Sequence, residues 1–196
     1  GFFKDNKVYL KNFNKKIIDD MEKKNIVEYP PKNDSYETEI ELNQLMMKKI
    51  DRDKRQKNID LEIERAGGVY NIIDNNEEIK IVNQALDFID PIIFYFKHKF
   101  DRVRPHFLRK EINPSIKVPE HPAYPSGHAT QAYTTALIMG YLFPDKKSYY
   151  YKRAENVAKN REYAGVHYVS DSVAGERIAT YLLPIIVKKF NLKSKK

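Results

Sequence analysis

The segment AYPSGHATQAY, residues 123–133, brings together residue types that can bind an anion at the start of a helix. Ser126 is a typical helix N-cap, and Pro125 suits the first helical turn. The unpaired backbone N–H groups of such a turn attract negative charge, and Gly127 would let a ligand approach the backbone closely. His128 would then face the bound anion. An ordinary helix start uses the same residues, so this segment alone leaves both interpretations open.

Two further clusters could supply positive charge and a nucleophile. In KHKFDRVRP, Lys97 and Arg104 are about two helical turns apart, so both can lean toward the same side. In NREYAGVHYVSD, Arg161 precedes His167, and Asp171 follows that histidine by four positions. This spacing lets the carboxylate hold one imidazole nitrogen and direct the other outward. Taken alone, Lys97 and Arg104 could also lie on a solvated helix face. His167 and Asp171 could also form an ordinary local hydrogen bond.

Together, the three clusters contain the groups that phosphoryl transfer requires. A phosphate ester needs fixed positive charges, short hydrogen-bond donors, a nucleophile and a proton donor for the leaving oxygen. The acidic residues are scattered rather than clustered as metal ligands, so we expect no bound metal. The cations are Lys97, Arg104 and Arg161, the short donors are Ser126 and Gly127, and the remaining roles fall to His128 and His167.

The composition limits the class of protein. A chain of 196 residues fits one domain with a substantial core. The absence of cysteine excludes thiol chemistry, disulfides and cysteine-based zinc sites. A formal net charge of +8 favours anionic partners. The basic residues are nevertheless spread along the chain without an aromatic recognition motif, so we expect no nucleic-acid partner.

The apolar runs are short. The longest, PIIFYF and TYLLPIIV, do not reach the ~20 residues of a membrane-spanning helix, so we expect a soluble protein. No signal peptide is visible. The chain opens GFFKDN without a methionine, which is consistent with an N-terminal segment removed by processing.

Hydrophobic periodicity predicts an all-α fold, a helical bundle in a single domain. Residues 1–35 are polar and lysine-rich and end near two prolines, so they are interpreted as a peripheral N-terminal arm with a short helix at 16–24. Residues 36–196 form the helical domain. Its predicted helices cover residues 36–65, 75–100, 126–142, 147–163 and 170–192. Charged residues interrupt the first of these segments, and a strand at 59–63 is a less favoured alternative there.

Prolines and charge predict the remaining features of the helical domain. Pro91 should kink or divide its helix, and Pro184 should bend the last one. Four prolines make residues 104–124 a loop. The final KKFNLKSKK is predicted to be a frayed basic tail.

The three clusters resemble, in order, the motifs of the type 2 phosphatidic acid phosphatase superfamily. The matching patterns are a lysine, six residues and RP, then YPSGH, then an arginine, five residues, a histidine, three residues and an aspartate. The chain is most similar to the soluble bacterial class A nonspecific acid phosphatases, through FDRVRP, AYPSGHATQAYTTAL and YAGVHYVSD. The likeness runs from about residue 79 to 187. One departure is Asn160, because the third motif of the family usually begins with serine before the arginine.

The resemblance implies a helical bundle of the acid phosphatase and vanadium haloperoxidase type, acting as a phosphomonoesterase on small phosphorylated compounds. It also implies no metal or cofactor, inhibition by vanadate, and a periplasmic or secreted location, and it is compatible with a homo-oligomer. Asn160 should alter binding detail more than reaction class. By motif position, His167 would attack phosphorus, and Asp171 would orient the His167 ring. His128 would protonate the leaving oxygen and later activate water. The residues that would hold the phosphate oxygens are Lys97, Arg104, Ser126, Gly127 and Arg161.

Two related activities remain open at this point. A vanadium-dependent haloperoxidase would use the same residues, with His167 as the vanadate ligand, although such relatives are usually much longer. A lipid phosphate phosphatase would need an apolar approach to the site. The other histidines, His98, His106 and His121, are not expected to do direct chemistry, although His106 and His121 could line the mouth of the pocket.

Overall fold

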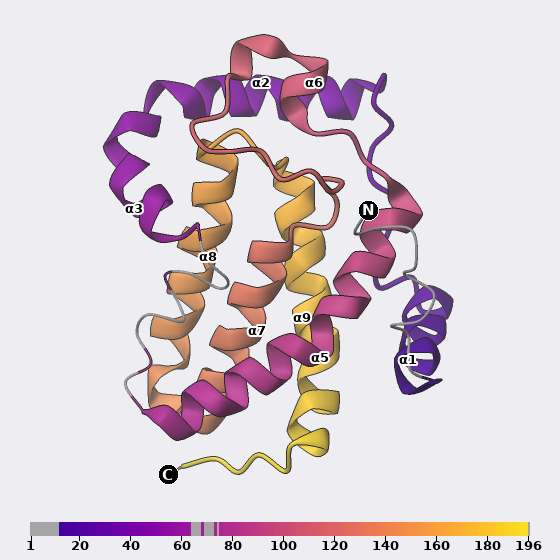
Figure 1. The fold of residues 1–196 in the computed structure, drawn as a ribbon, viewed down its shortest axis with the longest axis vertical. Helices are drawn as coiled ribbons and strands as arrows, with labels where there is room; N and C mark the ends of the chain where they lie inside the picture. Colours follow the sequence, from indigo (N-terminus) through magenta and orange to yellow (C-terminus); the bar gives the residue numbers. More distant parts are fainter. Residues whose placement is uncertain (1–11, 64–67, 69–72, 74, 196) are drawn as a thin grey trace.

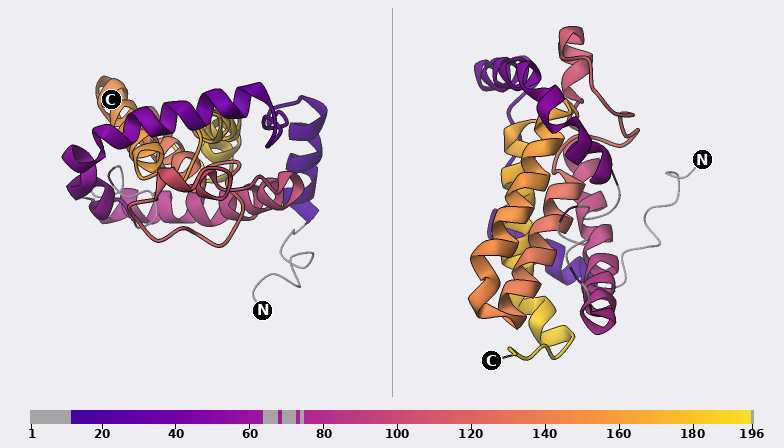
Figure 2. Two further views of the ribbon diagram at one scale, coloured as in Figure 1. Left: turned by 90° about the horizontal axis from the view of Figure 1, so that it is seen from above. Right: turned by 90° about the vertical axis from the view of Figure 1, so that its left-hand side faces the viewer.

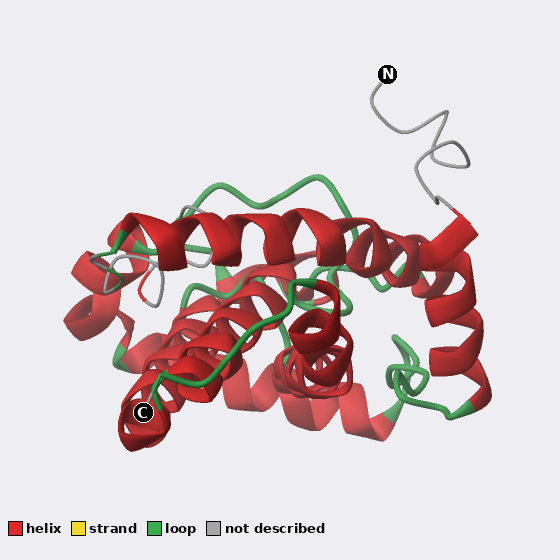
Figure 3. Cartoon of the chain, turned by 90° about the horizontal axis from the view of Figure 1, so that it is seen from below, coloured by secondary structure: helices red, strands yellow, loops and turns green. Residues whose placement is uncertain are grey.

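The computed structural model describes all residues except 1–11, 64–67, 69–72, 74 and 196. Every regular element among the described residues is a helix, and the remaining segments are loops and turns (Figure 3). The predicted all-α class is therefore confirmed.

Four long helices form the bundle, and α7 lies at its centre (Figure 1). Helix α7 (Gly127–Leu142) packs against α5 (Asn76–Phe100), α8 (Lys147–Tyr163) and α9 (Val169–Lys189). Its residues are apolar or small on nearly all sides, and a helix of this kind is stable only when neighbours surround it. The main hydrophobic core lies between these helices, and residues such as Ala132, Leu86 and Ile178 are fully buried in it.

The prediction that Pro91 might divide its helix is wrong. Helix α5 continues without a break from Asn76 to Phe100, and α9 likewise continues through Pro184. A proline removes one backbone donor and disturbs one turn, whereas Ile89 and Ile92 beside Pro91 are fully buried in the core. Packing on both sides of the proline therefore holds α5 together.

A layer of shorter elements lies across the end of the bundle where α5 and α8 end and α7 and α9 begin (Figures 1 and 2). Helix α2 (Tyr36–Ile50) begins at Ser35, whose hydroxyl accepts a hydrogen bond from the Thr38 N–H group. It ends at Ile50, its C-cap Asp51 begins the predicted charged interruption, and α3 (Gln56–Leu61) follows a short 3-10 turn. Residues 59–61 are thus helical, and the end of the predicted 36–65 segment lies outside the described residues.

Two peripheral segments pack more closely than the sequence suggested. Helix α1 (Asn12–Lys23) buries Ile18 and Met21 in the main core beside α5, while the boundary at residue 35 stays a prediction. The prediction of a frayed tail is wrong for the described residues. The Lys195 N–H group donates to the carbonyl oxygen of Leu142 at 2.7 Å, and the Lys195 ammonium lies 2.6 Å from Glu78 Oε1.

Candidate active site

The residues of AYPSGHATQAY and NREYAGVHYVSD meet where α7 and α9 begin, beneath α2 (Figure 1). The Ser126 N–H group donates to the carbonyl oxygen of Asp171 at 3.0 Å and joins the two helix starts. Gly175 in the second turn of α9 makes this approach possible, because a Cβ there would lie 2.9 Å from the backbone nitrogen of Thr130. The close contact of the two helices therefore brings the two motifs together.

His167 and Asp171 form the predicted pair. His167 Nδ1 lies 3.0 Å from Asp171 Oδ2, and the same oxygen accepts a hydrogen bond from the Tyr168 N–H group at 3.0 Å. On the other side of the ring, Arg104 Nη1 lies 3.1 Å from His167 Nε2. A guanidinium can only donate, so Nε2 accepts and Nδ1 carries the proton. The Nε2 lone pair of His167 thus points away from Asp171, toward the cations.

Three buried cations lie near His167, and the positive charge of each lowers its pKa. The Arg104 guanidinium donates to the carbonyl oxygens of Val166 at 2.7 Å and His121 at 2.9 Å. The Lys97 ammonium donates to the carbonyl oxygen of Pro122 at 2.7 Å. Arg161 is 2% exposed, and its Nε and Nη1 atoms are buried without a hydrogen-bond partner. Within the described part of the chain, no acidic side chain forms a hydrogen bond or ion pair with these three cations, so an anion would supply the missing counter-charge.

In KHKFDRVRP the helix ends where the sequence predicts, because α5 ends at Phe100. The spacing of about two helical turns, by which Lys97 and Arg104 were expected to lean toward the same side, therefore does not describe their approach. Asp101 then adopts a left-handed conformation with φ 44°, and Arg104 becomes the N-cap of the short helix α6 (Pro105–Leu108). A turn, rather than a helical face, therefore brings the arginine back beside the bundle.

Burial and mutual repulsion perturb the titration of these groups. Burial lowers the pKa of Lys97 well below its usual 10.5, and the charge of Arg104 lowers it further. Burial also lowers the pKa of Arg104 to about 10 and that of Arg161 to about 10. The pKa of His167 lies well below 6.5, first because of burial and then because of Arg104 and Lys97. Surroundings of this positive charge disfavour further protonation and favour an anion.

The start of α7 offers fewer donors than predicted. Ser126 is the N-cap, and its hydroxyl accepts from the Ala129 N–H group at 3.3 Å, so Pro125 lies before the helix and not in its first turn. The backbone N–H group of Ser126 is occupied by Asp171, but its hydroxyl can still donate. The N–H groups of Gly127 and His128 open the helix without an intrahelical acceptor. A Cβ at Gly127 would lie 3.8 Å from Lys97 Cε, so this glycine faces the lysine.

His128 lies at the edge of the site. Its Nε2 atom is 2.8 Å from the carbonyl oxygen of Ile63, which can only accept, so Nε2 carries a proton. Burial, followed by the charge of Arg161, lowers the pKa of His128 to about 3. Among the other histidines, His121 places Nδ1 3.1 Å from Arg104 Nη2 and lies closer to the site than predicted.

Asn160, where the family pattern has serine, connects α8 to α3. Its amide nitrogen donates to Glu62 Oε2 at 2.7 Å, and its oxygen accepts from Arg55 Nη1 at 3.1 Å. Burial raises the pKa of Glu62, while Asn160 and nearby arginines lower it. Asn160 therefore holds a carboxylate close to Arg161.

Sequence reasoning missed Arg102 and Glu41. Arg102 Nη1 lies 2.8 Å from Asp171 Oδ1, and Arg102 Nη2 lies 2.7 Å from Glu41 Oε2. Arg102 lies within KHKFDRVRP, two positions before Arg104, and could have been found there. Glu41 lies on a separate helix more than fifty residues away and carries no sequence signal.

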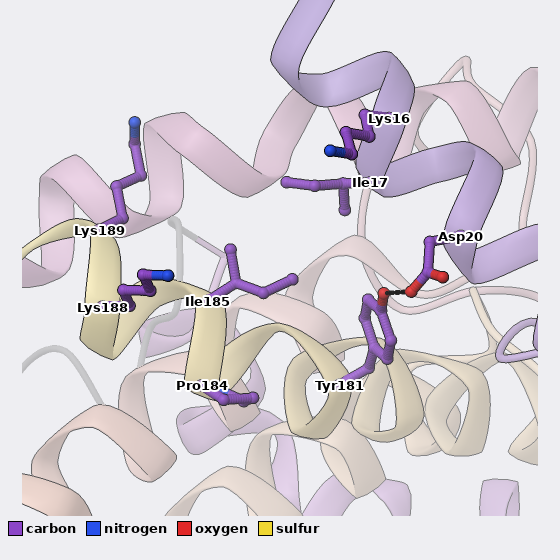
Figure 4. Close-up of a pocket in the computed structure, with 8 residues that line it drawn as sticks. All are labelled: Lys16, Ile17, Asp20, Tyr181, Pro184, Ile185, Lys188 and Lys189. Atoms are coloured by element: carbon purple, nitrogen blue, oxygen red, sulfur yellow. Dashed lines mark hydrogen bonds between the residues drawn. The ribbon is translucent and has the colours of Figure 1, made fainter.

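Other features of the described residues lie apart from this site. Figure 4 shows a groove of about 700 Å³ between α1 and the C-terminal half of α9, where the Tyr181 hydroxyl donates to Asp20. No three histidine, aspartate or glutamate side chains in the described part of the chain gather as a metal site. Within that same part, no helix is both long enough and apolar enough to cross a membrane.

Comparisons with known proteins place the chain in a family. A comparison with curated protein sequences gives no match. One similar solved structure is a transmembrane PAP2-type phosphatidylglycerolphosphate phosphatase from Bacillus subtilis, with a TM-score of 0.46 and 17% identity. That likeness covers 97% of this chain and 92% of the other. The family model described as the PAP2 superfamily matches residues 81–195, more than half of the chain, and this match includes all three motifs. The protein therefore belongs to the PAP2 superfamily.

Proposed function

We propose that this member of the PAP2 superfamily is a phosphatase that hydrolyses phosphate monoesters of small molecules through a phosphohistidine on His167. The observation that carries the proposal is the buried Arg161, whose Nε and Nη1 atoms lack partners beside two further cations. Buried charges are ordinarily paired, so this arrangement is suited to an anionic ligand. A phosphate dianion would accept these donors and balance the charge.

In the first step, His167 Nε2 attacks phosphorus while the bond from phosphorus to the ester oxygen breaks. The leaving oxygen takes a proton from His128. Arg104 must exchange its hydrogen bond to Nε2 for one to a phosphate oxygen as substrate binds. Asp171 stabilises the positive charge that develops on the imidazole, because Nδ1 donates to its Oδ2.

In the second step, water attacks the phosphohistidine and transfers a proton to His128. The bond between phosphorus and nitrogen breaks, inorganic phosphate leaves, and both histidines return to their first state. The low pKa of His128 is caused by burial and by the positive charge of Arg161. A bound phosphate dianion replaces net positive surroundings with negative charge and raises that pKa toward the working range.

The two histidines are distinguished by p-nitrophenyl phosphate, whose leaving group needs little protonation. His167→Ala removes the nucleophile, so turnover should fall by several orders of magnitude without a covalent intermediate. His128→Ala keeps the nucleophile but lacks the base of the second step. A pre-steady-state burst of nitrophenol and an acid-labile, alkali-stable phosphoenzyme should therefore appear only in His128→Ala. A label on His128 would reverse the two roles.

The reaction class is tested on a panel of substrates with and without EDTA. We propose that side-chain cations replace a metal, so activity should survive the chelator, and vanadate should inhibit competitively as a transition-state analogue. Loss of activity to EDTA, restored by a divalent metal, would argue against this mechanism. A strong preference for a lipid phosphate would assign the lipid phosphate phosphatase activity instead. Bromide oxidation by peroxide with added vanadate would assign the haloperoxidase activity.

A further inference from the structure

We propose that Glu41 and Arg102 are positioning residues that act on His167 through Asp171, an inference that rests on the proposed function. They form a chain of ion pairs behind the nucleophile, on the side of Asp171 that does not face the imidazole. Asp171 Oδ2 is occupied by His167 and Tyr168, whereas Oδ1 accepts from Arg102 at 2.8 Å. Both oxygens of the carboxylate are therefore fixed.

Arg102 is held more firmly than an ordinary ion pair requires. It is 3% exposed, and its guanidinium carbon lies 3.7 Å from the centre of the Tyr168 ring. Its Nη1 atom also donates to the Ser170 hydroxyl at 2.6 Å. Stacking and hydrogen bonds together leave the guanidinium a single orientation, which is the role that suits arginine better than lysine.

Glu41 completes the arrangement from outside the bundle. Its Oε2 atom accepts from Arg102 Nη2 at 2.7 Å and from the Ser170 hydroxyl at 2.9 Å, and its Oε1 atom accepts from the Ser170 N–H group at 2.7 Å. Residue 41 lies in α2, before the residues that match the family model. The peripheral helix thus contributes a charge to the nucleophile's surroundings.

The charge balance explains what Glu41 does. With Glu41 present, two carboxylates balance the charge of Arg102. The negative charge of Asp171 is then only partly offset by Arg102 and can stabilise a positively charged imidazole. Without Glu41, Asp171 alone would balance Arg102 and would stabilise a phosphorylated, positively charged His167 less well. The other groups that act on His167 come from α5, α6, α7 and α8, and they are Lys97, Arg104, His128 and Arg161.

The test compares Glu41→Gln with the matched control Glu162→Gln. Glu162 is a buried carboxylate of α8 that forms an ion pair with Lys48 of α2, so both substitutions weaken the attachment of α2 by the same chemical change. Wild type and both variants are assayed with p-nitrophenyl phosphate across a range of pH. Thermal unfolding checks that each variant is folded.

For Glu41→Gln we expect kcat to fall roughly tenfold with little change in KM, as for groups coupled within one network of ion pairs and hydrogen bonds. The acid limb of the kcat/KM profile should move to lower pH, because His167 loses a negative charge that favours its protonation. Glu162→Gln should have the kcat of the wild type, and the acid limb of its kcat/KM profile should lie at the wild-type pH. The inference would be overturned if kcat fell equally in the two variants and the acid limb of the kcat/KM profile stayed in place, because Glu41 would then have a structural role only.

A second measurement separates this inference from the proposed function. The Nδ1–H proton resonance of His167, assigned by its absence from His167→Gln, reports the hydrogen bond to Asp171 without any substrate. It should shift in Glu41→Gln and stay in place in Glu162→Gln. A wild-type protein that hydrolyses no phosphate monoester would refute the proposed function alone. An unchanged resonance in Glu41→Gln would refute the positioning role, whatever the activity.

Discussion

Arg102 and Arg161 are buried to almost the same extent near one histidine, yet their surroundings are opposite. Arg102, at 3% exposure, forms ion pairs with Glu41 and Asp171. Arg161, at 2% exposure, leaves Nε and Nη1 without a partner. Two carboxylates balance the charge of Arg102, although its Nε also lacks a partner, whereas no ion pair between described residues involves Arg161. Partners, rather than burial, thus distinguish an arginine that supports the site from one that binds at it.

Substitution in the paired region should have the largest effect, and it should be on stability. Arg102→Met leaves Glu41 and Asp171 buried without their cation, which should cost about 3–5 kcal/mol of unfolding free energy. Urea unfolding followed by circular dichroism measures this loss. A cost below about 1 kcal/mol would show that the two carboxylates find other partners, and the contrast with Arg161 would disappear.

Arg161→Met should act on binding and catalysis and leave stability intact. Removing a buried cation whose Nε and Nη1 lack partners relieves a desolvation cost, so the free energy of unfolding without ligand should rise. kcat/KM should fall roughly 10²–10³-fold, as for the loss of one oxyanion donor. Steady-state kinetics and urea unfolding of the same preparation check both parts. A loss of stability equal to that of Arg102→Met would mean that Arg161 is a structural residue.

The titration of His167 should produce a moderate effect of pH on stability. Its folded pKa lies well below 6.5, so the unfolded chain takes up a proton that the folded chain refuses. The stabilisation is therefore present above pH 6.5 and is lost as the pH falls below that value. Relative to His167→Gln, the wild-type free energy of unfolding should fall more steeply, by about 1.4 kcal/mol per pH unit. Parallel slopes for the two proteins would contradict the low pKa.

Asn160→Ser, which restores the usual residue of the family motif, should have the smallest effect. The substitution removes the hydrogen bonds to Glu62 and Arg55, each worth about 0.5–1.5 kcal/mol. KM should change by less than about fivefold, and kcat should stay near the wild-type value. Kinetics on a substrate panel measure both. A large fall in kcat would show that Asn160 takes part in catalysis.

The structure shows why some parts of the site were predictable and others were not. The His167–Asp171 contact and the Ser126 cap are local, and their geometry follows from spacings of four and three residues at helix starts. The end of α5 at Phe100 was also predicted, but helical spacing does not explain the approach of Lys97 and Arg104, because a turn with Asp101 in the left-handed region lies between them. The path of the chain after such a turn depends on tertiary contacts, which override local propensity.

The sequence by itself determined the helical class, the start and end of α8, and the residues that could hold and attack a phosphate, since these depend on periodicity and on motifs with fixed spacing. Only the tertiary structure decided that Glu41 of α2 forms an ion pair with Arg102, that the carbonyl oxygen of Ile63 accepts a hydrogen bond from His128, and that Nε and Nη1 of Arg161 lack partners. These contacts join residues far apart in the chain. Their distances depend on how whole helices pack, which local sequence does not encode.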